Sequence, residues 1–176
     1  MSERTPGPDV ARLAVTLRLA QRADAAATAE IYNLEVTDST LVFDLVPRTL
    51  DEQVEWIDRH AGAHPAVVAL DPRGQVVGFG SLSAYRSRPA YATSVESSVY
   101  VRRDQRGRGV GRAVVDELVR LARVHGFHCL IARIVGANDA SIALHAGCGF
   151  EMVGVEREVG RKFGRWLDVA LMQLLL

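Results

Sequence analysis

The most constraining feature of this sequence is the junction VYVRRDQRGRGVGRAVVDEL, which begins at Val99. An apolar, β-branched run gives way to three glycines at every second position among arginines, and an apolar pattern with helical spacing follows. Glycine permits positive φ angles and a close approach to the backbone. The first N–H groups of a helix have no internal partner and lie at the positive end of its dipole. The junction therefore predicts a strand, a tight turn and a helix whose start binds an anion, typically phosphate.

Two common phosphate-binding motifs do not fit this junction. A P-loop needs Lys and then Ser or Thr after its last glycine, whereas Arg112 and Ala113 follow Gly111 here. The dinucleotide fingerprint G-x-G-x-x-G lies in the first βαβ unit, whereas Gly107 and Gly109 come late in the chain with a different spacing. The formal net charge is +0, which is unlike the basic excess of nucleic-acid binders. We therefore expect a local anionic ligand and no nucleic-acid partner.

The periodicity of the chain predicts one domain over 14–176, preceded by a flexible tail over 1–13 that is rich in Pro, Gly and charge. The expected class is α/β (α+β), a mixed and mostly antiparallel sheet of about seven strands flanked by about four helices. Strands are expected over 14–20, 65–70, 75–84, 92–101, 128–135, 151–159 and 165–176, and helices over 22–36, 49–62, 110–125 and 138–148.

Local signals predict how the first two helices begin and end. Asp24 is placed to cap the first helix. Thr49 and Glu52 have the spacing of a capping box for the second helix, and Gly62 would end it. The expected buried face of the first helix consists of Ala27, Ile31 and Leu34.

Membrane, disulfide and metal signals are weak. No apolar run reaches the roughly 18 residues of a membrane span, and the first residues lack the apolar core of a signal peptide. Cys129 and Cys148 are too few for a disulfide framework, so we expect buried, reduced thiols in a cytoplasmic protein. The histidines have no ligand spacing, so we expect no metal.

The junction resembles the coenzyme A signature (Q/R)-x-x-G-x-(G/A) of the GNAT N-acetyltransferase superfamily, which Arg106, Gly109 and Gly111 match. Nearly the whole chain beyond the tail resembles the phosphinothricin and methionine sulfoximine acetyltransferase branch. The similar segments are IYN, TLVF, YRSRPAY, VESSVYV, GANDASIALHAGCGF and KFGRWLDV. The resemblance implies acetyl transfer from acetyl-CoA to the amino group of a small amino acid or analogue.

The resemblance also implies where acetyl-CoA binds. In this family the sheet is splayed at the coenzyme, pantetheine pairs with the exposed strand, and the loop amides hold the pyrophosphate. Asn138 and Ser141 begin the following short helix and would lie at the coenzyme as well. The implied contacts are Val99, Tyr100, Val101, Arg106, Gly107, Arg108, Gly109, Val110, Gly111, Arg112, Asn138 and Ser141.

Acetyl transfer requires a base, because an amino group with a pKa of ~7.7–8.0 or higher is largely protonated. Glu96 is the single charge in TSVESSVYV, and an unpaired buried charge would be costly, so it must face a cleft or solvent. The resemblance implies that Glu96 is the catalytic base. His145 stands where many family members have a tyrosine that protonates the leaving thiolate, so it is either the general acid or only a coenzyme contact.

The acceptor is expected to bind at YRSRPAY. Arg86 and Arg88 can hold a carboxylate or phosphinate by forked hydrogen bonds, with Tyr91 and Phe43 as walls of the pocket. The branch usually has a polar, acidic run after Phe43, whereas this chain has DLVP. That departure puts phosphinothricin itself in question more than acetyl transfer.

Two other functions stay open. A protein or peptide N-terminal acetyltransferase of the same fold would need an open groove without a carboxylate clamp, and a non-catalytic CoA-binding sensor would not turn over. We expect a small-molecule amine and no membrane as partners. A homodimer is possible, because the apolar end VALMQLLL fits a dimer contact as well as a core strand. Lys162, Trp166 and Asp168 would shape either the pocket or that contact.

Overall fold

The structure, a computed structural model, describes residues 12–136 and 138–176. The strands in these residues are β1 (Thr16–Leu19), β2 (Ala66–Leu70), β3 (Val76–Ala84), β4 (Ser94–Val101), β5 (Cys129–Val135), β6 (Glu151–Lys162) and β7 (Arg165–Leu175). The α-helices are α1 (Ala25–Asp38), α2 (Leu50–Arg59), α3 (Val110–Val124) and α4 (Asp139–Gly147).

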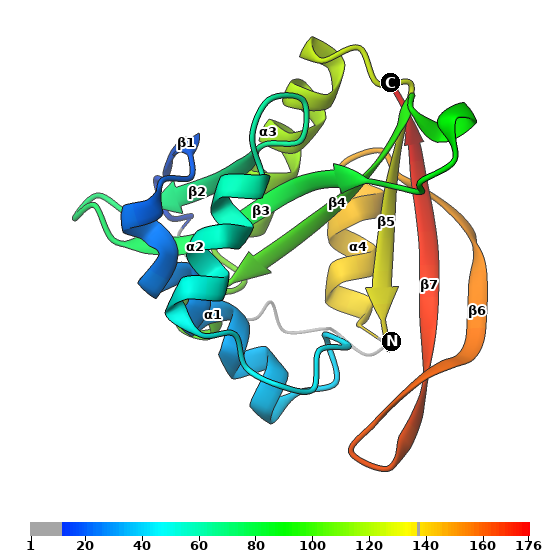
Figure 1. Ribbon diagram of the computed structural model, residues 1–176, viewed down its shortest axis with the longest axis horizontal. Coiled ribbons are helices and arrows are strands. Elements are labelled where there is room, and N and C mark those ends of the chain that lie inside the picture. The colour runs from blue at the N-terminus through cyan, green and yellow to red at the C-terminus, as the bar shows by residue number, and fades with distance from the viewer. Residues whose placement is uncertain (1–11, 137) are drawn as a thin grey trace, which may run out of the picture.

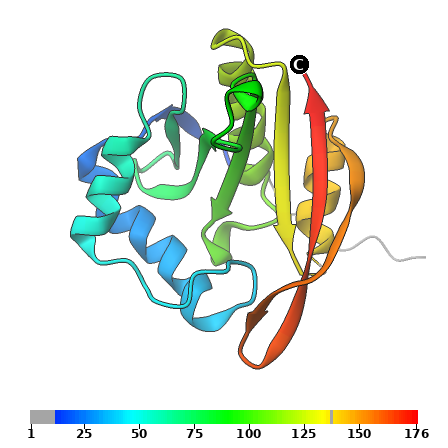
Figure 2. The same cartoon turned by 45° about the vertical axis from the view of Figure 1, so that its right-hand side comes forward.

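The strands form one seven-stranded sheet in the order β1-β2-β3-β4-β5-β7-β6. Neighbouring strands are antiparallel except β4 and β5, which are parallel. Helices α1 and α2 lie on one face of the sheet, and α3 and α4 lie on the other (Figures 1 and 2). The class and the element order expected from the sequence are therefore confirmed.

The two faces of the sheet carry two hydrophobic cores. Val114 and Leu118 of α3 are fully buried in the larger core, and Phe79 of β3 packs in the smaller core beneath α1. Helix α3 ends before Gly126, whose φ of +76° suits glycine. β7 lies between β5 and β6 in the sheet, and Met172 is 2% exposed, so VALMQLLL forms a core strand rather than a free contact surface.

The helix starts differ in how far the sequence predicted them. The capping box of α2 is confirmed, because Thr49 Oγ1 accepts from Glu52 N at 3.2 Å and Glu52 Oε2 accepts from Thr49 N at 2.7 Å. α2 ends at Arg59, before the expected stop at Gly62. The prediction for Asp24 was wrong, because its carboxylate does not cap α1. It accepts from Gln21 N at 2.8 Å and from Arg18 at 2.7 and 2.8 Å.

The buried face of α1 is rotated from the expected one. Leu34 is 39% exposed and Ala27 is half-buried, whereas Ile31 is buried as expected. Tyr32 packs edge-on against Tyr100 of β4, with ring centroids 5.1 Å apart. With Tyr32 at this contact, the next buried positions of α1 are Glu35 and Val36 rather than Leu34.

Most of the predicted tail over 1–13 lies outside the described residues. At its end, Leu13 N donates to Arg108 O at 2.9 Å, so this residue is attached to the glycine turn. Cys129 and Cys148 are free thiols, and both are half-buried rather than buried. Over the described ranges, no helix is long and apolar enough to cross a membrane, and no group of three His, Cys, Asp or Glu side chains could hold a metal ion.

Candidate active site

The central feature of the sheet is that β4 and β5 part halfway along their length (Figure 1). Their parallel pairing ends at Ser97 and Ala132. β4 stays paired with β3 as far as Val101, and β5 stays paired with β7 as far as Val135. Among the residues that the structure describes, the edge of β4 that faces β5 therefore has no strand partner after Ser97, as expected for a splayed sheet.

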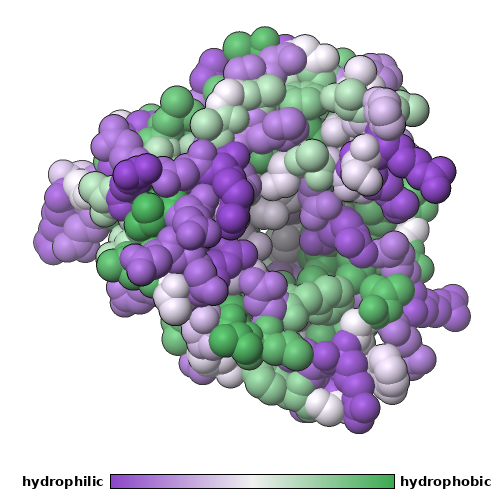
Figure 3. Space-filling view, viewed as in Figure 1, coloured by the Kyte–Doolittle hydropathy of each residue, from purple (hydrophilic) through white to green (hydrophobic). Residues whose placement is uncertain are grey.

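A cavity of about 430 Å³ occupies the opening between the two strands, and Figure 3 shows this face of the molecule hollowed near its centre. Its wall comes from β4, β5, the glycine turn, the start of α3, one face of α4, the end of α1 and the loop after it. The expected coenzyme residues in this wall are Val99, Tyr100, Val101, Arg106, Gly107, Gly109, Gly111, Arg112, Asn138 and Ser141.

The glycine turn leaves the start of α3 open to this cavity. Gly109 has a φ of +88°, a conformation that L side chains rarely adopt. A Cβ on Gly111 would lie 3.0 Å from Leu144 Cδ2 and 3.5 Å from Val101 Cγ2, so glycine lets α3 approach α4 and β4 closely. The first bonded helical N–H is that of Ala113, at 3.1 Å from Gly109 O. The N–H groups before Ala113 have no partner inside the helix, as the donors of an anion site require.

The arginines of the turn are bonded to protein groups. Arg112 donates to Asp116 Oδ2 at 2.8 Å and to Gly147 O at 2.6 Å. Two expected coenzyme contacts are not in the cavity wall. Arg108 donates to Gln105 Oε1 at 2.7 Å, and the Val110 side chain is 1% exposed in the core. The guanidinium groups of Arg108 and Arg112 therefore already have protein partners, whereas the first N–H groups of α3 have none inside the helix.

Glu35 of α1 is a wall residue that the sequence analysis missed. It is 4% exposed, and its Oε1 accepts from Arg103 at 2.8 Å and from Arg106 at 2.7 Å. Burial alone would raise the pKa of Glu35, but these two arginines hold it below the ordinary value. Its Oε2 is buried and has no hydrogen-bond partner among the described residues. The sequence signal for the burial of Glu35 is its position on the same helix face as Ile31 and Tyr32, which precede it at helical spacing.

Glu96 lies on β4 one residue before the pairing with β5 ends, and it is not among the residues that line the cavity. Val95 and Ser97 point into the core side of β4, so the Glu96 side chain projects to the face that carries α1 and α2. Burial raises the pKa of Glu96, the charge of Arg133 opposes that rise, and the charge of Glu156 adds to it. The result is a carboxyl group that holds a proton more readily than a surface glutamate does.

His145 of α4 contributes to the cavity wall and is 3% exposed. Its Nδ1 lies 2.8 Å from Ser141 O. Because a carbonyl oxygen only accepts, Nδ1 carries the proton in the neutral ring and Nε2 has the lone pair. Burial lowers the pKa of His145, and the bond to Ser141 opposes that shift only in part.

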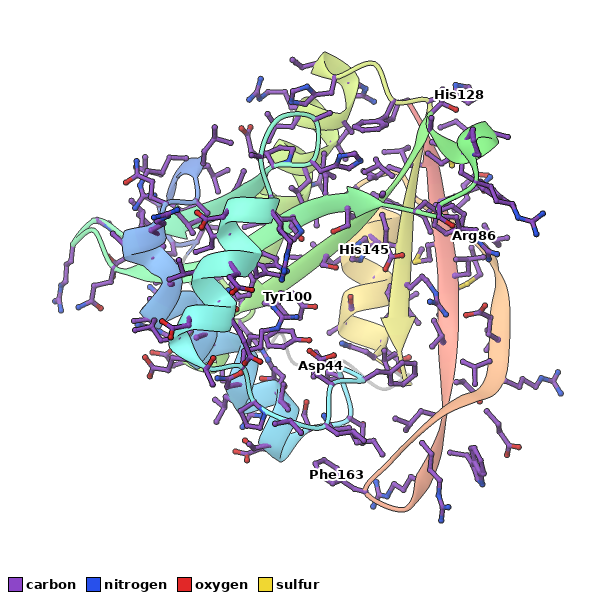
Figure 4. The ribbon with its side chains drawn as sticks, viewed as in Figure 1. Asp44, Arg86, Tyr100, His128, His145 and Phe163 are labelled. Carbon is purple, nitrogen blue, oxygen red and sulfur yellow. The ribbon has the colours of Figure 1, made fainter. Side chains whose placement is uncertain are left out.

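The expected acceptor residues lie apart from this cavity. Arg86, Arg88 and Tyr91 line a second hollow that shares no residue with the first. Figure 4 shows Tyr100, His145 and Asp44 around the opening between β4 and β5, whereas Arg86 lies beside β7. Phe43 is not in the wall of the first cavity either.

Phe43 instead fixes the hairpin of β6 and β7 to the loop between α1 and α2. A Cβ on Gly160 would lie 2.5 Å from the Phe43 ring. Lys162 is 2% exposed, and its Nζ donates to Glu35 O at 3.3 Å and to Val42 O at 3.0 Å. Lys162 therefore shapes the loop beside the cavity, and Figure 2 shows this hairpin reaching toward that loop.

Fold and site together define a protein that binds an extended, phosphate-bearing ligand between two parted strands. The family model described as an acetyltransferase (GNAT) domain matches residues 17–171. The chain therefore belongs to the GNAT acetyltransferase family, and it is an acetyl-CoA-dependent N-acetyltransferase.

Named relatives cover nearly the whole chain. It is 40% identical over 165 residues to the L-methionine sulfoximine/L-methionine sulfone acetyltransferase of Pseudomonas paraeruginosa. The aligned region covers 93% of this chain and 96% of that protein. A phosphinothricin acetyltransferase from Sinorhizobium meliloti, solved with acetyl-CoA, is 42% identical with a TM-score of 0.89, over 92% of this chain and 88% of that one. A ribosomal-protein-alanine N-acetyltransferase from Brucella melitensis is 39% identical with a TM-score of 0.88, over 92% and 99%.

The first prediction concerns the glycine turn. Gly109→Asp places a side chain and a negative charge at the donors of the anion site, so CoA binding should be lost. CoA at 100 times its dissociation constant should stabilise the native protein by ~2.7 kcal/mol, measured as a thermal shift. Gly126→Asp is the matched control, because Gly126 also has a positive φ, +76°, at the other end of α3. An equal CoA shift in native protein and folded Gly109→Asp would remove the turn from the coenzyme site.

Proposed function

We propose that the chain, as one domain over 14–176, transfers the acetyl group of acetyl-CoA to the amino group of a small amino acid or analogue. The observation that carries the proposal is the cavity between β4 and β5, which begins at Ser97, directly after Glu96, a carboxyl group of raised pKa. The guanidinium of Arg133, which lines this cavity, pairs with the carboxylate of Glu156 on β6. Relatives named for methionine sulfoximine, methionine sulfone and phosphinothricin support an acceptor with an acid group.

The wall residues fit acetyl-CoA. The backbone edge of Ser98–Val101 is free of a strand partner and suits the amides of pantetheine. The open N–H groups at the start of α3 suit the pyrophosphate, and Glu35 Oε2 suits an N–H or O–H donor. When bound, acetyl-CoA supplies a thioester carbonyl that the amine attacks.

Glu96 is the general base of the proposed reaction. An acceptor amine arrives largely as ammonium and must lose a proton before it can attack. Burial of Glu96 raises its pKa toward that of the amine, which improves proton transfer at neutral pH. His145 serves as a hydrogen-bond acceptor toward the ligand through Nε2. Proton donation by His145 would need a second proton on the ring, and burial opposes that.

The function itself is tested with a panel of amines. The native enzyme with acetyl-CoA should release free CoA with methionine sulfone or methionine sulfoximine, and more slowly with a peptide of free N-terminus. The likeness to a ribosomal-protein-alanine acetyltransferase makes the peptide the informative comparison. A faster reaction with the peptide would favour an N-terminal acetyltransferase, and CoA binding without any turnover would favour a sensor.

The two catalytic assignments are separated by their pH profiles. Glu96→Gln should lower kcat by ~10²–10⁴-fold at neutral pH, with a smaller loss at high pH, where the amine deprotonates unaided. Because the pKa of Glu96 is raised, the acid limb of native kcat/KM should lie above the range of ordinary carboxyl groups and vanish in this variant. His145→Gln should raise KM for acetyl-CoA without moving either limb. A basic limb that disappears in His145→Gln would make His145 the proton donor, and near-native turnover of Glu96→Gln would place the base elsewhere.

We also propose that the enzyme is a cytoplasmic homodimer. β6 is an edge strand, and free edges with apolar side chains pair readily. The free thiols of Cys129 and Cys148 suit the reducing environment of the cytoplasm. The large apolar side chains exposed on β6 and β7 are Met152 47%, Val153 51%, Val155 53%, Val159 51%, Trp166 60% and Leu175 59%.

Sedimentation equilibrium tests the dimer. The native chain should sediment at twice its 19.2 kDa, and Val155→Lys should be monomeric because a charge would be desolvated at the contact. Val124→Lys is the matched control, since Val124 is 65% exposed on α3. A native monomer, or an intact Val155→Lys dimer, would place the contact elsewhere or remove it.

A further inference from the structure

Arg133 is a charged residue in the middle of an otherwise apolar strand, HCLIARIV. It is the first residue of β5 after the pairing with β4 ends at Ala132. Ala132 and Ile134 are buried in the larger core, so the Arg133 side chain projects from the opposite face of the sheet. Glu96 projects from that same face, and its register partner on β5 is Ile131, two residues before Arg133.

The Arg133 guanidinium borders the cavity itself. Arg133 lines the opening between β4 and β5, and its side chain is 37% exposed. Within residues 12–136 and 138–176, its guanidinium donates to Glu156 Oε2 on β6 and to no other group. A guanidinium has five N–H donors in a planar fork, so most of the hydrogen-bonding capacity of Arg133 is unused by the protein.

The ion pair between Arg133 and its partner Glu156 can open at small cost. The Glu156 side chain is 38% exposed, so water can solvate its carboxylate when the ion pair opens. A partly exposed ion pair contributes little net stability. An incoming carboxylate that takes the place of Glu156 keeps the charge of Arg133 paired, so the exchange adds no buried, uncompensated charge.

The alternative basic residues are less well placed. Arg86 and Arg88 line the second hollow and not the cavity between the strands. Arg86 already lies over the ring of Tyr85, with 5.0 Å between Cζ and the ring centroid. Of these three arginines, only Arg133 lines the cavity between β4 and β5. Arg133 also projects from the face of the sheet that carries Glu96.

We propose that Arg133 is the specificity-determining residue that binds the acid group of the acceptor, displacing Glu156. The proposal rests on the proposed function, because it names the recognition element for the same amino-acid acceptor. A carboxylate held in two hydrogen bonds by the fork fixes the orientation of the neighbouring amine. Glu96, on the same face, then receives the proton of that amine.

The test compares an acceptor with its own decarboxylated form. The two substrates are L-methionine sulfone and the amine that remains when its carboxyl group is replaced by hydrogen. Arg133→Gln should lower kcat/KM for the amino acid roughly 10- to 100-fold and leave that for the amine nearly unchanged. Arg133→Lys keeps the charge but loses the fork, so its loss should lie in between. The ratio of the two substrates also cancels any effect of Arg133 on the basicity of Glu96, which both share.

Two further variants separate recognition from structure. Glu156→Gln frees the fork, so KM for the amino acid should fall and the ratio should rise. Arg120→Gln is the matched control, because Arg120 is an exposed arginine paired with Glu117 at 2.8 Å on α3, and it should leave the ratio unchanged.

The proposal is overturned if Arg133→Gln slows both substrates equally, or if Arg88→Lys changes the ratio and Arg133→Gln does not. Either result leaves the proposed function standing. Turnover of neither substrate by the native enzyme would instead overturn the proposed function, and the role of Arg133 with it.

Discussion

The early end of the pairing between β4 and β5 is the constraint on which the rest of the molecule depends. Each strand keeps its outer partner, β3 or β7, for longer than it keeps its inner one. The inner edges therefore present backbone donors and acceptors that a sheet would normally satisfy. A ligand with amide groups can take the place of the missing strand, and the sheet supplies hydrogen bonds without any dedicated side chain.

The opening is held from the side by contacts between distant segments. Lys162 ties the β6–β7 hairpin to backbone carbonyls of α1 and of the loop after it. Burial lowers the pKa of Lys162, so its ammonium group relies on those carbonyls for what water would otherwise provide. Glu35 joins the end of α1 to the glycine turn through Arg103 and Arg106. Together these contacts connect the β6–β7 hairpin, the end of α1 and the glycine turn.

Sequence reasoning predicted the elements that repeat a local pattern. The capping box at Thr49 and the glycine turn at Gly109 are local signals, and the structure confirms both. The prediction that Asp24 caps α1 failed because its carboxylate can accept from several neighbours, and here it accepts from Arg18 of β1. The prediction of the buried face of α1 also failed because of a contact with a residue that is remote in sequence. Tyr32 of α1 packs against Tyr100 of β4.

The candidate site shows the same division. Glu96 is the single charge in TSVESSVYV, and Arg133 is likewise the single charge in HCLIARIV. The family resemblance pointed to Glu96 and not to Arg133. That β5 presents Arg133 beyond the end of its pairing with β4 follows from strand register, which the sequence of one strand does not encode. The separation of Arg86 and Arg88 from the cavity is likewise a matter of how a loop folds back.

The close fit of Phe43 on Gly160 couples two segments that are far apart in the sequence. The loop after α1 and the β6–β7 hairpin are separated by more than half of the chain, yet any side chain at position 160 would collide with the Phe43 ring. A loop transplanted from a relative would therefore keep its shape only if the hairpin came with it. The two segments form one exchangeable unit, which evolution or an engineer must replace as a pair.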